Sequence, residues 1–146
     1  MGQQQLLLLV LSTVIVGLAT VAGIQAFSEN QAQASQDALV QRGTSIASDV
    51  QGLYGKPSQM GGIDAFDNSG IDGPTVANRL GYDHSSGVVD APGAGSDGRC
   101  EILTNGNTVR VECASGDATQ DVRVTFNPSN ADPVSTSFDS DYGVSS

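Results

Sequence analysis

The chain has 146 residues, which is enough for one small globular domain and a long helix but too few for a large enzyme core. It carries 16 Asp and Glu against 6 Lys and Arg, a formal charge of −10. Nucleic acid is therefore not an expected partner, because phosphate binding needs clusters of basic side chains. The acidity predicts a well-solvated exterior, and it also suits a salt-rich habitat in which screening weakens self-repulsion.

The most apolar part of the chain is the segment Leu6 to Phe27, which contains no charged residue. A helix of this length reaches about 33 Å, close to the thickness of a bilayer hydrocarbon core. The first basic side chain of the chain is Arg42, whereas a signal peptide begins with basic residues and has a shorter apolar core. We therefore expect a helix that can span a membrane, with a signal peptide cleaved near Ala26 as an alternative.

The helical pattern continues beyond Phe27 as an amphipathic helix that reaches about residue 55. No proline precedes Pro57, and small or apolar residues recur every three or four positions, as they do along one helix face. This stripe consists of Ala32, Ser35, Leu39, Gly43, Ile46, Val50 and Leu53. The first half of the helix thus requires an apolar environment, and the second half requires a folded domain.

This N-terminal design resembles that of the type IV pilin superfamily over about residues 1–55. The resemblance implies an α+β fold with an apolar helix at 1–27, an amphipathic helix at 28–55 and a small disulfide-bonded antiparallel β head at 56–146. It implies a structural subunit of a pilus-like extracellular filament on a prokaryotic cell, with roles of the adhesion or motility type. Its partners would be identical subunits in a helical homopolymer, the membrane before assembly, the pilus assembly machinery and a prepilin peptidase. We expect neither an enzymatic activity nor a cofactor.

Two features depart from the family pattern. If Met1 is the N-terminal residue left by the peptidase, Gln5 stands where the family usually has glutamate, and it keeps a hydrogen-bonding carbonyl without the charge. The proline found in many pilin helices is absent, and Gly17 and Gly23 are expected to loosen the helix instead. Small residues here would also let neighbouring helices approach closely. The expected assembly residues are Met1, Gln5, Gly17, Ala19, Ala22 and Gly23.

A single-span anchor explains the apolar segment equally well by its length. In that alternative the chain is a monomeric membrane-anchored surface domain that binds a partner, although the uncharged flanks leave its orientation unspecified. A minor pseudopilin of a secretion system lies between the two interpretations. A short basic leader encoded before Met1 would favour the pilin route, and an encoded start at Met1 would favour the anchor.

Residues 100–113, CEILTNGNTVRVEC, give the strongest local signal in the head, because two alternating runs flank an Asn-Gly pair. If Cys100 and Cys113 lie opposite each other, the loop is Asn105 to Thr108, and Ile102 and Val111 share the face of the cysteines. The opposite face then carries Glu101, Leu103, Arg110 and Glu112. A disulfide formed in an oxidising compartment is the expected state, with free thiols or a metal site as alternatives.

The remaining elements of the head are predicted with less detail. Residues 121–126, DVRVTF, alternate as the third strand of an antiparallel meander. Residues 61–98 read mostly as a loop over the helix, with a helical turn at Pro74 to Leu80. The polar tail offers Phe138, Tyr142 and Val144 as anchors of a last edge strand, and we expect the C-terminus on the outer surface or against a neighbouring subunit.

Candidate residues for catalysis or metal binding are few. His84 lies in a polar loop without a nucleophile motif, so a solvated histidine is favoured over a catalytic one. Asp64, Asp67, Asn68 and Asp72 offer the oxygen ligands that calcium takes, but their spacing does not match an EF-hand. Asp, Asn and Gly clusters commonly form turns, so turn chemistry is favoured, with a weak calcium site as the alternative.

Overall fold

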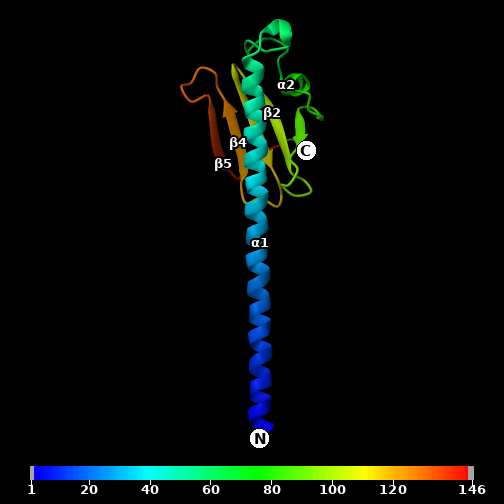
Figure 1. Ribbon diagram of the computed structural model, residues 1–146, viewed down its shortest axis with the longest axis vertical. Coiled ribbons are helices and arrows are strands. Elements are labelled where there is room, and N and C mark those ends of the chain that lie inside the picture. Colours follow the sequence, from blue (N-terminus) through cyan, green and yellow to red (C-terminus); the bar gives the residue numbers. More distant parts are fainter. Residues whose placement is uncertain (1, 145–146) are drawn as a thin grey trace. The chain divides into compact units, whose positions relative to one another are not determined.

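The computed structural model describes residues 2–144 and has the expected α+β architecture. A long helix, α1 (Gly2–Tyr54), precedes a five-stranded antiparallel sheet in the order β1-β2-β3-β4-β5 (Figure 1). The strands are β1 (Val88–Asp90), β2 (Arg99–Asn105), β3 (Thr108–Ala114), β4 (Asp121–Phe126) and β5 (Val134–Asp139). Two short helices, η1 (Ser58–Met60) and α2 (Gly73–Leu80), lie between α1 and the sheet in sequence. The chain divides into two units, residues 1–32 and 33–146, which are described separately.

The first unit consists of the N-terminal part of α1. All of residues 2–31 are exposed, including every large apolar side chain between Leu6 and Phe27. Within residues 2–144, α1 is the one helix with the length and composition to cross a membrane, and its most apolar window has a mean hydropathy of 2.5. An N-terminal signal sequence satisfies the same two criteria.

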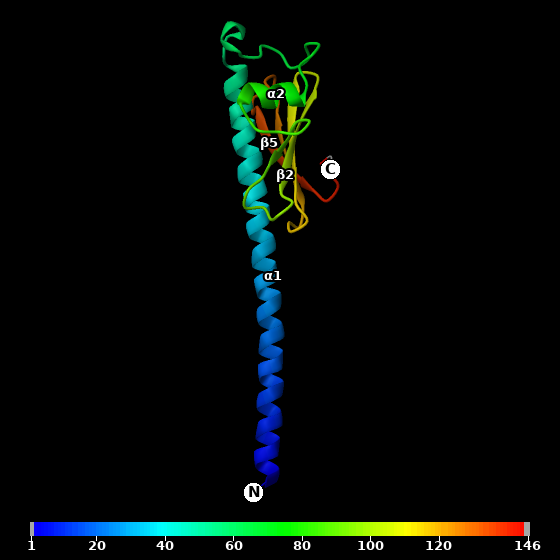
Figure 2. The same ribbon diagram turned by 90° about the vertical axis from the view of Figure 1, so that its right-hand side faces the viewer.

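The second unit, the head, is built on the C-terminal part of α1. From residue 33 onward this helix runs lengthwise over one face of the sheet (Figures 1 and 2). The predicted stripe is confirmed from Ser35 to Leu53, with Ala47 as an additional member, whereas Ala32 is only half-buried. The strands present alternate residues to the helix, so that Val122, Val124 and Phe126 of β4 are buried. A single apolar layer between helix and sheet forms the core.

Gly43 is a position at which α1 lies close against the sheet. A Cβ atom at residue 43 would lie 3.0 Å from Cγ2 of Val124 and 3.3 Å from Sγ of Cys113. Both neighbours are fully buried, so neither has open space to move into. The absence of a side chain at Gly43 therefore sets the distance between helix and sheet.

The β2–β3 hairpin has the predicted register, with Cys100 opposite Cys113 and Ile102 opposite Val111. The predicted four-residue loop is wrong, because Asn105 pairs with Thr108 and the turn contains only two residues. The first turn residue, Gly106, has a φ of 56°. A positive φ at this position is what the tight hairpin turns that match the strand twist require, and glycine adopts it without strain.

The segment between α1 and β2 is more ordered than a plain loop. The predicted helical turn is confirmed as α2, which begins after Asp72 and ends before Gly81. The Asp72 carboxylate accepts a hydrogen bond from the backbone N–H of Thr75 at 2.9 Å, so it serves as the N-cap. Strand β1 then adds an edge to the sheet beside β2.

Candidate functional site

The apolar segment Leu6 to Phe27 is the most unusual surface of the chain, because nothing in the described residues covers it. Leu6 is 66% exposed, Leu18 67% and Phe27 73%, whereas the core residues of the head are almost completely buried. At about 25 cal/mol per Å² of apolar surface, such exposure to water is strongly unfavourable. The segment therefore requires lipid or other apolar chains around it.

The three hydroxyl side chains within the apolar segment bond to backbone carbonyls of the same helix. The hydroxyl of Ser12 donates to the carbonyl of Leu9 at 2.9 Å, and that of Thr13 donates to the carbonyl of Val10 at 2.8 Å. The Thr20 hydroxyl donates to the carbonyl of Val16 at 2.7 Å. A hydrocarbon environment offers no water, so these internal bonds remove the main cost of placing the hydroxyl groups there.

The small residues of this segment have no packing role within the described chain. A Cβ atom added at Gly17 or Gly23 would meet no heavy atom within 4 Å, in contrast to Gly43 in the head. Ala19 and Ala22 are likewise exposed, as is Gln5 near the start of α1. The expectation for Met1 lies outside the described residues. A helical glycine costs about 1 kcal/mol relative to alanine, and folding of the described chain gives no reason for this cost at residues 17 and 23.

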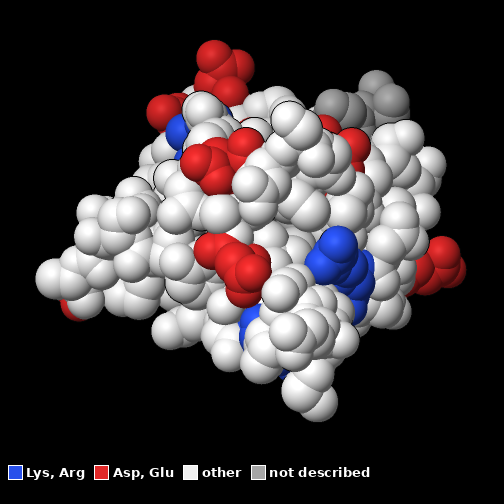
Figure 3. Space-filling model, turned by 90° about the horizontal axis from the view of Figure 1, so that it is seen from above, with Lys and Arg blue, Asp and Glu red and all other residues white. Residues whose placement is uncertain are grey.

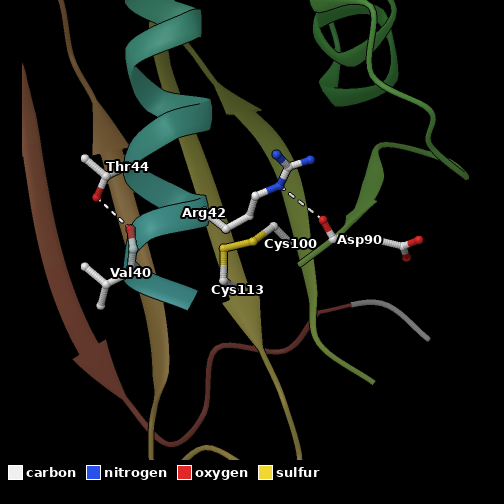
Figure 4. Close-up of a disulfide and its surroundings, with 6 residues drawn as sticks. All are labelled: Val40, Arg42, Thr44, Asp90, Cys100 and Cys113. Atoms are coloured by element: carbon white, nitrogen blue, oxygen red, sulfur yellow. Dashed lines mark hydrogen bonds between the residues drawn. A yellow bond between two sulfur atoms is a disulfide. The ribbon is translucent and has the colours of Figure 1, made fainter. Parts of the chain in front are cut away.

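The disulfide between Cys100 and Cys113 lies in the core, under the helix. The bond joins β2 to β3, and both cysteines are fully buried (Figure 4). Beside it, Nε of Arg42 on α1 donates to the carbonyl oxygen of Asp90 on β1 at 3.1 Å (Figure 4). The disulfide thus links β2 to β3, and the charged hydrogen bond beside it links the helix to β1.

The face of the sheet that points away from α1 carries a buried ionic cluster. Glu101 and Glu112 were predicted to point away from the helix, yet both are buried. Nε and Nη2 of Arg123 each lie 2.8 Å from Oε1 of Glu112, and the Arg123 guanidinium stacks over the Tyr142 ring at 3.8 Å. The C-terminal tail therefore packs over this face through Tyr142. The sequence contained part of the signal, because the meander pairs Glu112 with Arg123, but it did not place Tyr142.

A second polar cluster joins α1 to the segment after α2. The Tyr82 hydroxyl donates to the Asp49 carboxylate, and the Arg42 guanidinium lies 5.0 Å from the centre of the Tyr82 ring. Burial, followed by the bond to Asp49, raises the pKa of Tyr82 to about 12. The phenol therefore stays protonated and acts as a structural donor, not as an acid or base near neutral pH.

Three of the candidate catalytic and metal-binding residues, His84, Asn68 and Asp72, have local structural partners. Nδ1 of His84 accepts a hydrogen bond from the backbone N–H of Gly87 at 3.0 Å, which closes a turn. Asp72 caps α2, and donation from the Thr75 hydroxyl and backbone N–H lowers the pKa of Asp72. The amide of Asn68 donates to the carbonyl of Ala65 at 3.3 Å. Among the described residues, no group of three His, Cys, Asp or Glu side chains is placed to hold a metal ion.

Two further carboxylates, Asp97 and Asp121, have shifted pKa values at the end of the sheet where β2 and β4 begin and β3 ends. Bonds from the backbone N–H of Gly116 and the hydroxyl of Ser115 lower the pKa of Asp97. Burial, followed by repulsion from Asp139, raises the pKa of Asp121. The cause of the repulsion is the sheet register, which places Asp121 directly opposite Asp139.

The face of the head that is seen from above in Figure 3 carries no continuous basic surface. Seen from above, Lys and Arg atoms appear as separate small groups among acidic and uncharged residues (Figure 3).

Comparison of the chain with known protein-family models, with curated proteins and with solved structures gives no match.

Proposed function

We propose that this protein is a structural subunit of a pilus-like extracellular filament, which assembles through the apolar segment Leu6 to Phe27. One observation carries the proposal: one helix has an apolar half that is fully exposed and a second half that is covered by its own head. Before assembly, lipid would surround the apolar half. In the filament, the same segments of identical subunits would surround each other.

Close helix packing would drive assembly from the membrane. Lipid tails are as apolar as leucine, so little hydrophobic free energy is gained when a helix leaves the bilayer for a helical bundle. Van der Waals contact between closely packed backbones must therefore supply the free energy of assembly, and small residues allow this close contact. Gly17, Ala19, Ala22 and Gly23 are small and have no described intrachain role, which supports their assignment to this contact.

The properties of the head suit the exterior of such a filament. The buried disulfide suits an oxidising compartment outside the cytoplasm. The formal charge of −10 favours solubility of the exposed surface. The head has its own core between helix and sheet, so it does not need the filament to remain folded.

The first experiment is electron cryomicroscopy of filaments sheared from the cell surface, with mass spectrometry of the N-terminus of the protein. Thin filaments of this chain that begin at an N-methylated Met1 would support the proposal. A protein found only in detergent extracts, as a monomer without N-methylation, would instead be a single-span anchor of a surface domain.

Two matched leucine variants test the packing argument. We expect Gly17→Leu to abolish filaments while the chain still inserts in the membrane. Gly52→Leu is the control, because residue 52 also lies in α1 and an added Cβ there also meets nothing within 4 Å, but it belongs to the head. A normal filament yield from Gly17→Leu would refute close packing at this position.

A further inference from the structure

Strand β5 forms an open edge of the sheet. Within residues 2–144, β5 pairs only with β4, and its other side has no strand partner (Figure 1). Residues 135–139 are exposed and Val134 is half-buried, so β5 is the least covered of the five strands. An edge of this kind presents unpaired backbone N–H and C=O groups, to which another extended strand can bond.

The sequence of this edge is self-complementary. Residues 134–138 read Val-Ser-Thr-Ser-Phe, a pattern that is symmetric in residue type about Thr136. The register with β4 places Val134, Thr136 and Phe138 on the face toward α1 and the two serines on the other face. A strand with this symmetry matches a second copy of itself when the two run antiparallel.

We propose that β5 pairs antiparallel with β5 of a second copy of this chain, with Thr136 at the two-fold axis. Thr136 then faces Thr136 of the second copy, Ser135 faces Ser137, and Val134 faces Phe138. Cross-strand pairs of threonines, and of an aromatic with a β-branched residue, are among those that stabilise antiparallel sheets. The same surface is used by both copies, as a closed two-fold interface requires.

The pairing also covers an apolar side chain that the head leaves open. Phe138 is 48% exposed and lies beside a hollow of about 240 Å³ between α1 and β5. The other residues of this hollow are Gln33, Gln36, Asp37 and Val40. In the paired sheet, Val134 of the second copy comes against the Phe138 ring and removes part of its surface from water.

The proposed register keeps the flanking carboxylates apart. Asp139 faces Pro133 of the second copy, and Asp132 faces Ser140, so no two carboxylates are directly opposed across the interface. Repulsion between two chains of formal charge −10 still opposes association. Pairing should therefore strengthen as salt screens these charges.

The two-fold geometry determines which copies can meet. The head portion of α1 runs lengthwise along the sheet (Figures 1 and 2), so the two copies of this portion point in opposite directions in the pair. The partner therefore comes from an opposing surface or an oppositely directed filament and not from a neighbour of the same orientation. The inference concerns the head alone and stands whether the apolar segment forms a filament or a membrane anchor.

Variants of the full chain with one added cysteine, studied in detergent, test both the pairing and its register. Under mild oxidation we expect Thr136→Cys to form a disulfide-linked dimer by itself. Ser135→Cys and Ser137→Cys should cross-link when mixed and only weakly when separate, because identical positions off the axis are diagonal neighbours. The native disulfide is fully buried, which limits exchange with the new thiol. Gln120→Cys, an exposed position outside β5, is the control.

A charge on the axis provides the second measurement. Thr136→Lys places two ammonium groups face to face. We expect the wild-type chain to form a dimer in analytical ultracentrifugation at high salt, and the variant to lose it. The melting temperature of the head should stay unchanged in the variant. Dimers made through the apolar segment would persist in this variant. The proposal is overturned if Thr136→Cys cross-links no more than Gln120→Cys, or if Thr136→Lys leaves the dimer intact.

Discussion

Substitution of Gly43 by alanine tests whether the distance between helix and sheet is as tight as the structure indicates. The new methyl group would lie 3.0 Å from Cγ2 of Val124 and 3.3 Å from Sγ of Cys113. Both neighbours are constrained, since Val124 is a β-branched residue of a central strand and Cys113 is held by the disulfide. The helix or the sheet must therefore shift.

Two opposing effects determine how much Gly43→Ala changes the free energy of unfolding. Overpacking of a core costs about 1–3 kcal/mol, whereas alanine gains roughly 0.5–1 kcal/mol over glycine within a helix. Gly52→Ala isolates the second effect, because a Cβ at residue 52 meets no heavy atom within 4 Å. The free energy of unfolding should therefore be lower in Gly43→Ala than in Gly52→Ala by about 1–3 kcal/mol, which is the packing cost alone.

Thermal unfolding of the full chain in mild detergent, followed by the near-UV circular dichroism of the head tyrosines, measures this difference. A change of 1 kcal/mol shifts the melting temperature of a small domain by about 4–8 °C. Gly52→Ala should melt above the wild type, and Gly43→Ala below Gly52→Ala by at least about 4 °C. Equal stabilisation by both substitutions would show that the sheet yields freely at Gly43, and the close-approach argument would be refuted.

Three further predictions concern the sheet. Arg123→Ala should lower the free energy of unfolding by about 2–4 kcal/mol, because it leaves the buried Glu112 carboxylate without this cation; partial recovery on adding Glu112→Gln, in urea melts, would verify the cause. Reduction of the Cys100–Cys113 bond, at a sequence separation of 13, should cost about 3 kcal/mol by the chain-entropy argument, and an unchanged urea midpoint would contradict it. Because the pKa of Asp121 is raised, the folded state keeps the Asp121 proton at pH values where the unfolded state, with the usual pKa of 3.8, has lost it. The protonated carboxyl therefore contributes its full stability to the fold below pH 3.8, and this contribution is lost as the pH rises through the folded-state pKa. The urea midpoint of Asp121→Asn should therefore exceed that of the wild type more at pH 7 than near pH 4, and an equal difference at both pH values would contradict the shift.

Periodicity and turn chemistry predicted most of the fold from local patterns. The charge-free run from Leu6 to Phe27 and the stripe from Ser35 to Leu53 reflect the helical repeat, which is a property of the sequence alone. The register of the β2–β3 hairpin followed from alternation together with the two cysteines, because a slip by one residue would turn every apolar side chain to the wrong face. The hairpin loop was predicted too long, since Asn105 and Thr108 pair through the backbone, whose hydrogen bonds are not encoded by residue type.

The features that only the tertiary structure decided all depend on segments that are distant in the sequence. Tyr142 covers Arg123 from the tail, and Glu101 and Glu112 are buried on the face that alternation directed away from the helix. The helical repeat also does not reveal which glycines of α1 the fold requires, because it treats all helical glycines alike. Gly43 touches the sheet whereas Gly17 touches nothing described. A periodic pattern specifies which side of an element is apolar, but burial, pairing and close approach depend on what the rest of the chain places against that side.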